Sequence, residues 1–127
     1  MNRRAKIKSM TTLACAIVHA RGGGCVMRGS HEGKLEAHHW VPRSRGWQYA
    51  TDPENISLVC TRHHVEIPKK RLQPEYIDAI VSQVQDKYAA TTPHPVTDDE
   101  IRERADQLSS EAELAGVEIP SWMRRRQ

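Results

Sequence analysis

Two adjacent histidine pairs, His38-His39 and His63-His64, lie within the thirty residues from Leu35 to His64. They hold four of the chain's seven histidines and bracket a basic loop. Imidazole is the commonest metal ligand in proteins, and because it titrates near neutral pH it also accepts and donates protons. Packing alone does not explain such pairs, so the stretch indicates a metal site, a proton-transfer site or both.

The residues around the first pair predict a strand, a long loop and a second strand. The alternating pattern of Lys34–Val41 is typical of a strand. In a regular strand His38 and His39 point to opposite faces, and only an irregular strand end would turn both toward one cavity. The polar segment Pro42–Glu54 predicts a loop, and the apolar, β-branched segment Ile56–Cys60 predicts the second strand.

The second histidine pair is predicted on a short helix. Thr61 is a suitable residue to cap its start, and Pro68 should end or bend it early. Consecutive residues on a helix diverge by about 100°. His63 and His64 can therefore serve two different sites.

Helices are also predicted on both sides of this region. The first has apolar side chains at helical spacing up to the glycines that follow Arg21, and the second begins at Pro74. The third begins with the capping box Thr97-Asp98-Asp99-Glu100 and ends at Gly116. We expect an α+β chain with one N-terminal helix (1–24), a central core (25–71) and a C-terminal extension of two helices (72–127).

The net charge of +3 is unevenly distributed along the chain. Residues 1–71 hold 13 Lys and Arg against 5 Asp and Glu, whereas residues 72–127 hold 6 against 11. The histidine pairs lie in the basic half, as expected if that half binds a polyanion. An ordinary solvated basic surface remains the alternative for the charge taken by itself.

The chain shows no feature of a secreted or membrane protein. Its three cysteines (Cys15, Cys25 and Cys60) are an odd number, so metal ligation or burial is favoured over a disulfide framework. No apolar run approaches the roughly twenty residues that span a bilayer, and the basic N-terminus lacks the apolar segment of a secretory signal. We expect a cytoplasmic protein without a membrane partner.

Residues 35–44 (LEAHHWVPRS) and 52–64 (DPENISLVCTRHH) together resemble the HNH family of metal-dependent nucleases. The resemblance covers roughly residues 21–70 and rests on order, spacing and local residue types together. It implies a ββα-metal finger, which consists of a hairpin, a long loop and one helix. It further implies endonuclease activity on DNA phosphodiester bonds, in the host cytoplasm if the protein is phage-encoded.

The resemblance also implies a role for each matched residue. His39 matches the general base that takes a proton from the attacking water, and Asn55 matches the asparagine that braces the loop and orients this base. His38 and His64 match the ligands of the catalytic divalent ion. Two neutral imidazoles favour Ni²⁺, Co²⁺, Mn²⁺ or Zn²⁺ over the harder Mg²⁺.

Many members of the family also hold a structural zinc with two C-x-x-C pairs. Here the corresponding positions are Cys25-x-x-Arg28 and Cys60-x-x-His63, and an arginine cannot bind a cation. One alternative is a zinc site of Cys25, Cys60 and His63, with His31 as a possible fourth donor. The other is loss of the zinc, with packing or an Arg28 hydrogen bond in its place, which the incomplete motif slightly favours.

Basic residues surround the motif and are candidates for contacts with DNA phosphates, which position a duplex without reading its sequence. They are Arg43, Arg45, Arg62, Lys69, Lys70 and Arg71. Small stand-alone members of the family are frequently phage proteins that work with genome packaging, so a terminase is an expected partner. The alternative function is a non-catalytic, zinc-dependent nucleic-acid-binding module or a terminase-associated scaffold.

Overall fold

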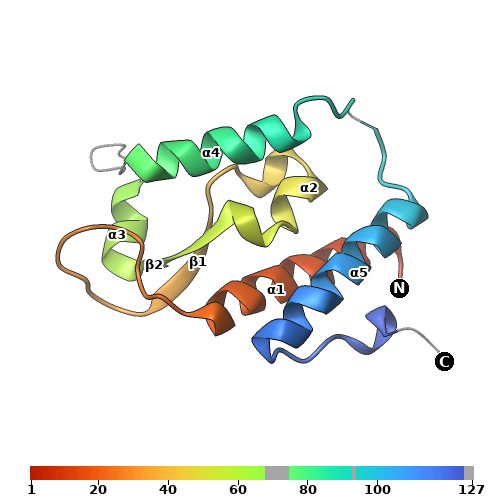
Figure 1. The fold of residues 1–127 in the computed structure, drawn as a ribbon, viewed down its shortest axis with the longest axis horizontal. Coiled ribbons are helices and arrows are strands. Elements are labelled where there is room, and N and C mark those ends of the chain that lie inside the picture. The colour runs from red at the N-terminus through yellow and green to blue at the C-terminus, as the bar shows by residue number, and fades with distance from the viewer. Residues whose placement is uncertain (68–74, 93, 125–127) are drawn as a thin grey trace.

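The chain forms a mixed α+β structure built on one two-stranded antiparallel sheet (Figure 1). We describe it from a computed structural model that covers residues 1–67, 75–92 and 94–124. The helices are α1 (Arg3–Arg21), α2 (Trp47–Ala50), α3 (Thr61–Glu66), α4 (Glu75–Tyr88) and α5 (Asp98–Ala115). The short 3₁₀ helices are η1 (Arg43–Arg45), η2 (Pro53–Asn55) and η4 (Ser121–Met123).

The sheet pairs β1 (Leu35–His39) with β2 (Ile56–Cys60), and α3 follows β2 without a break. Leu35 lies opposite Cys60 and His39 opposite Ile56, so the pairing is regular over all five residues of each strand. Both strands lie where the alternating and apolar patterns predict them. The first histidine pair therefore sits at the end of β1, while the second pair lies one turn beyond the end of β2.

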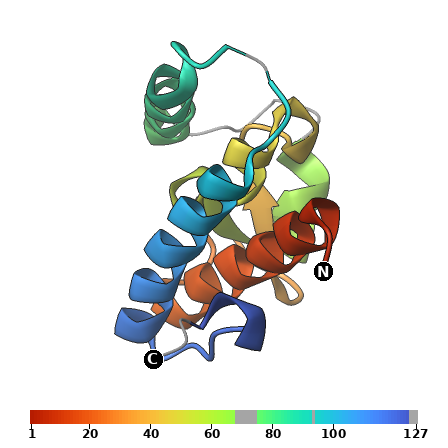
Figure 2. The same ribbon diagram turned by 90° about the vertical axis from the view of Figure 1, so that its right-hand side faces the viewer.

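The hairpin lies between two groups of helices, with α4 on one side and α1 with α5 on the other (Figure 1; Figure 2). Ile56 and Leu58 of β2 pack in a core with apolar residues of α1 and α5. Val59 packs in a second core with Trp40 and with Ile77 of α4. Because β2 is buried on both faces, it is held in place, and α3, which follows it directly, is positioned with it.

The ends of α5 confirm the predicted signals. The side chain of Thr97 accepts a hydrogen bond from the backbone N–H of Glu100, and the Glu100 carboxylate accepts one from the N–H of Thr97. Gly116 ends the helix in the left-handed region with φ 73°, which glycine adopts without strain. The helix thus begins and ends at residues that local chemistry specifies.

Two local predictions differ from the structure. The segment Pro42–Glu54 is not an irregular loop, because η1, α2 and the start of η2 lie within it. Thr61 does not cap α3 but is its first residue, since Cys60 takes the N-cap position with no side-chain cap. The Thr61 hydroxyl instead donates to the Lys34 carbonyl, 3.3 Å away, and so joins the start of α3 to β1. Pro68 and Pro74 lie outside the described residues.

Within the part of the chain that the structure describes, no helix has the length and apolar character needed to cross a membrane.

Candidate functional site

His38 and His64 face each other across the junction of β1 and α3. The Nδ1 atom of His38 lies 3.2 Å from the Nε2 atom of His64. The other ring nitrogen of His64, Nδ1, contacts the Glu36 carboxylate. Because a carboxylate only accepts, His64 donates from Nδ1, and in the neutral ring Nε2 then carries the free lone pair directed at His38. This contact also holds the pKa of Glu36 below its usual value, chiefly through the hydrogen bond from His64.

This nitrogen pair has the separation that one metal ion requires. Two nitrogens at about 2.0–2.1 Å from an ion lie about 2.9 Å apart at a right angle and about 3.4 Å apart at the tetrahedral angle. The observed 3.2 Å falls between them. Burial, together with the nearby charges of His64 and His39, lowers the pKa of His38 to about 4, so this ring is neutral at pH 7. His38 and His64 therefore present two facing ring nitrogens at a separation that suits one ion.

His39 is held by a different partner from its neighbour. Its Nε2 donates to the backbone carbonyl of Ala50, 2.9 Å away, which leaves Nδ1 as the unprotonated nitrogen of the neutral ring. Burial is the main reason that the pKa of His39 lies below its usual value; the Ala50 carbonyl raises it, and the charge of Arg43 lowers it further. The ring is half-buried. It is thus an oriented, neutral imidazole with one nitrogen able to accept a proton.

The Asn55 side chain joins two parts of the segment after β1 by hydrogen bonds to their backbone groups. Its side-chain oxygen accepts from the N–H of Val41 at 2.8 Å, and its amide donates to the carbonyls of Val41 at 2.9 Å and Tyr49 at 3.0 Å. The residue is fully buried, with no exposed surface. Since Ala50 follows Tyr49, these bonds position the carbonyl that holds His39.

A second cluster joins the loop between α1 and β1 to α3. One ligand atom each from Cys25, His31, Cys60 and His63 lies within 4.8 Å of all the others. Nδ1 of His63 lies 3.2 Å from the Cys60 sulfur, 3.5 Å from the Cys25 sulfur and 3.3 Å from Nδ1 of His31. Tetrahedral zinc with sulfur and nitrogen ligands gives ligand separations of about 3.4–3.8 Å. The four side chains therefore fit a metal such as zinc.

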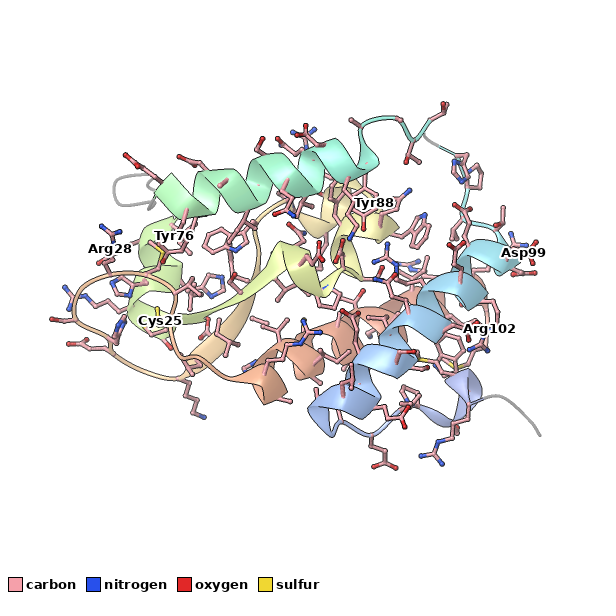
Figure 3. All side chains as sticks on the ribbon, viewed as in Figure 1. Cys25, Arg28, Tyr76, Tyr88, Asp99 and Arg102 are labelled. Atoms are coloured by element: carbon pink, nitrogen blue, oxygen red, sulfur yellow. The ribbon has the colours of Figure 1, made fainter. Side chains whose placement is uncertain are left out.

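The structure places His31 beside the two cysteines and His63, whereas Arg28 is not part of this cluster. Arg28 is exposed on the same loop as Cys25, where Figure 3 shows both residues. The loop turns back onto α3 through Gly33, whose φ is +84° and where an added Cβ would lie 2.6 Å from Thr61. Burial raises the pKa of the Cys60 thiol, but hydrogen bonds, led by the backbone N–H of His63, lower it to about 6. A thiolate at neutral pH is the form that binds metal.

The two histidines of α3 serve the two clusters separately, as the helical divergence predicts. His63 joins the cysteines and His64 joins His38. Of the basic candidates, Arg43, Arg45 and Arg62 are exposed. The remaining candidates, Lys69, Lys70 and Arg71, lie outside the described residues.

Sequence reasoning missed Glu36 as the partner of His64. The alternation of β1 contains the signal, because residues 36 and 38 share one face of a strand and His38 was already a candidate. It also missed Ala50. This residue contributes its backbone carbonyl, which every residue type has, so the sequence gives no signal for it.

No family model matches the chain. Comparisons with curated proteins and with solved structures also find no match.

Proposed function

We propose that the protein is a metal-dependent endonuclease of the HNH type, whose ββα-metal core consists of β1, β2, α3 and the segment between the strands. The observation that carries the proposal is the placement of three histidines. His38 and His64 present two facing nitrogens 3.2 Å apart, and His39 next to them is fixed on the Ala50 carbonyl. Their order along the chain matches the family's motif.

In this proposal each residue has one task. His38 and His64 hold a divalent ion, which when bound supplies positive charge to the scissile phosphate and the leaving oxygen. His39 takes the proton from the attacking water at Nδ1, because Nε2 is occupied by Ala50. Glu36 keeps His64 in the tautomer that binds the ion, a common role for a carboxylate behind a metal-bound histidine.

The cluster of Cys25, His31, Cys60 and His63 has a structural task in the same proposal. Four protein donors leave no open position, which is typical of a structural zinc site and not of a catalytic one. Zinc bound there would join the loop before β1 to the start of α3. It would thereby fix the helix that presents His64.

A plasmid-nicking assay tests the proposal. Zinc-loaded wild type should nick supercoiled DNA with Mn²⁺, Ni²⁺ or Co²⁺ more strongly than with Mg²⁺. His39→Ala should lower the rate by about 10²–10⁴-fold, the usual contribution of a general base, while zinc content and DNA binding persist. Equal nicking by wild type and His39→Ala would contradict the assigned role of His39.

A second candidate function is a zinc-dependent nucleic-acid-binding module or packaging scaffold without catalysis. The four-donor cluster favours it, because that cluster needs no reaction to account for it. This function predicts stoichiometric zinc and DNA or terminase binding, with no nicking in any of the four divalent metals. The same assay therefore separates the two.

A further inference from the structure

A basic cavity lies between α1 and the η1–α2 segment, next to the carbonyl that holds His39. Its volume is about 610 Å³, which falls within the range of about 300–1,000 Å³ typical of ligand sites. Arg4, Lys8 and Thr12 line it from α1, and Arg43 and Ala50 line it from the other side. Ala50 is the residue whose carbonyl accepts the hydrogen bond from His39, so the cavity adjoins the candidate active site.

The three α1 residues form a single face of the helix. They are spaced four apart, and residues four apart lie one above the other on a helix. No acidic side chain is among the residues that line the cavity. Arg4, Lys8 and Arg43 are exposed. Across the described ranges, no hydrogen bond or ion pair of their side chains is found. Three cations are therefore gathered around one hollow without a counter-charge.

Other basic residues of α1 are already engaged on another side of the helix. Arg3 forms an ion pair with Asp98 of α5 at 2.8 Å, and Lys6 lies over the Trp122 ring, 5.5 Å from its centre. These contacts join α1 to the C-terminal elements. Arg4 and Lys8 are exposed and form no such contact in the part of the chain that the structure describes, so their charges are available to a ligand.

We propose that this cavity binds the sugar–phosphate backbone of DNA beside the scissile bond, so that α1 is part of the nucleic-acid surface. Arg4 and Lys8 contact phosphates of the strand, and Arg43 bridges them to the site of His39. The statement that the scissile bond lies beside this cavity rests on the proposed endonuclease function. Binding of the DNA backbone in the cavity does not require cleavage. Contacts of this kind position a duplex and carry no sequence preference.

Fluorescence anisotropy with a labelled 20-base-pair duplex tests the proposal, using full-length protein that carries His39→Ala so that the DNA stays intact. The variant Arg4→Gln/Lys8→Gln is compared with its parent from 50 to 300 mM KCl. Each lost phosphate contact lowers the slope of log K against log salt by about 0.9. We therefore expect a slope smaller by about 1–2 and roughly tenfold weaker binding at 50 mM salt.

The matched control is Arg3→Gln/Lys6→Gln, which removes the same charge from the same helix on another side. It should change affinity less than about twofold, since the salt slope depends on the phosphates contacted. Thr12→Glu, which adds a negative charge within the cavity, should weaken binding without removing any native ion pair. Circular dichroism checks that each variant is folded.

The outcomes separate this inference from the proposed function. Equal weakening by both double variants, or no weakening by Arg4→Gln/Lys8→Gln and Thr12→Glu, overturns the cavity as the site. If the cavity variants weaken binding but the wild type nicks no DNA, the inference holds and the endonuclease proposal fails. If the wild type nicks DNA and the cavity variants bind normally, the endonuclease proposal holds and the inference fails.

Discussion

Asn55 shows how one buried side chain can position the backbone carbonyl that holds another side chain, His39. Its three hydrogen bonds all go to backbone groups, on Val41 and Tyr49. These residues flank the segment that begins after β1 and ends at the Ala50 carbonyl. The position of the His39 ring therefore depends on a residue sixteen places further along the chain.

Asn55→Ala should destabilise the fold substantially. It leaves one buried N–H and two carbonyls without their partner, and each unsatisfied buried group costs about 1–3 kcal/mol. We expect the free energy of unfolding in urea to fall by about 3–4 kcal/mol. Glu54→Ala is the control, because its side chain is 58% exposed and should change stability by less than about 1 kcal/mol. A comparable loss in both variants would contradict the bracing role.

Glu36→Gln should weaken metal binding without weakening the fold. An amide cannot hold His64 in one tautomer as a carboxylate does, because it offers a donor as well as an acceptor. Loss of such a partner typically costs 10–100-fold in metal affinity. Isothermal titration of zinc-loaded protein with Mn²⁺ or Ni²⁺ measures the effect, with Glu32→Gln as the charge-matched control. An unchanged affinity in Glu36→Gln would contradict the assignment of His64 as a ligand.

At the scale of elements, the four-donor cluster fastens a loop without secondary structure to a short helix. Cys25 and His31 lie on that loop, whereas Cys60 and His63 flank the start of α3. A six-residue helix is too short to be stable through its own hydrogen bonds. Its position depends on the hairpin before it and on the contacts made by the loop.

His31→Ala should lower zinc affinity more than about tenfold. Loss of a residue that only supports a ligand typically costs about 10–100-fold in metal affinity, and loss of the ligand itself should cost at least as much. The measurement is competition with a chromogenic chelator, together with zinc stoichiometry by atomic absorption. His19→Ala is the control, because His19 is exposed near the end of α1 and belongs to neither cluster. Full zinc affinity in His31→Ala would show that His31 is not a ligand.

The sequence predicts the elements whose signals are local and misses the contacts that join distant segments. Local alternation predicts β1, and a capping box with Gly116 predicts both ends of α5. The short helices between residues 43 and 55 escape prediction because polar composition is typical of loops, while the bonds of Asn55 that shape them reach back across the segment. The sequence cannot place His31 beside the cysteines, because its position depends on the turn at Gly33.

At the scale of the whole molecule, two helices are joined to the segment that contains Ala50, the acceptor for His39. The helix α4 reaches this segment through the buried Asp52 carboxylate, and α5 reaches it through Arg104. Asp52 is fully buried and accepts from Lys87 at 2.8 Å and from the Tyr88 hydroxyl, both at the end of α4 (Figure 3 labels Tyr88). Arg104 of α5 donates to Tyr88 at 2.9 Å and to the Thr51 carbonyl at 3.4 Å. The C-terminal extension thus supports the central core from outside it.

This network should make stability depend on acid pH. Burial by itself would raise the pKa of Asp52, but the hydrogen bonds from Lys87, Tyr88 and the Glu54 N–H outweigh it and hold the pKa below the usual 3.8. The unfolded state therefore binds more protons than the folded state near that pH. The stabilisation is complete above the unfolded pKa and is lost as the pH falls through the lower, folded pKa.

Asp52→Asn should lower the free energy of unfolding at pH 7 by about 2–3 kcal/mol, because an amide cannot accept all of these donors as a carboxylate does. The difference from wild type should shrink as the pH falls below about 4, where the wild-type carboxylate itself becomes protonated. Urea unfolding followed by tryptophan fluorescence between pH 7 and pH 3 measures both quantities. Asp86→Asn is the control, since Asp86 is exposed on α4 and should change stability by less than about 0.5 kcal/mol. A difference between wild type and Asp52→Asn that stays constant with pH would mean that the Asp52 charge does not hold the extension to the core.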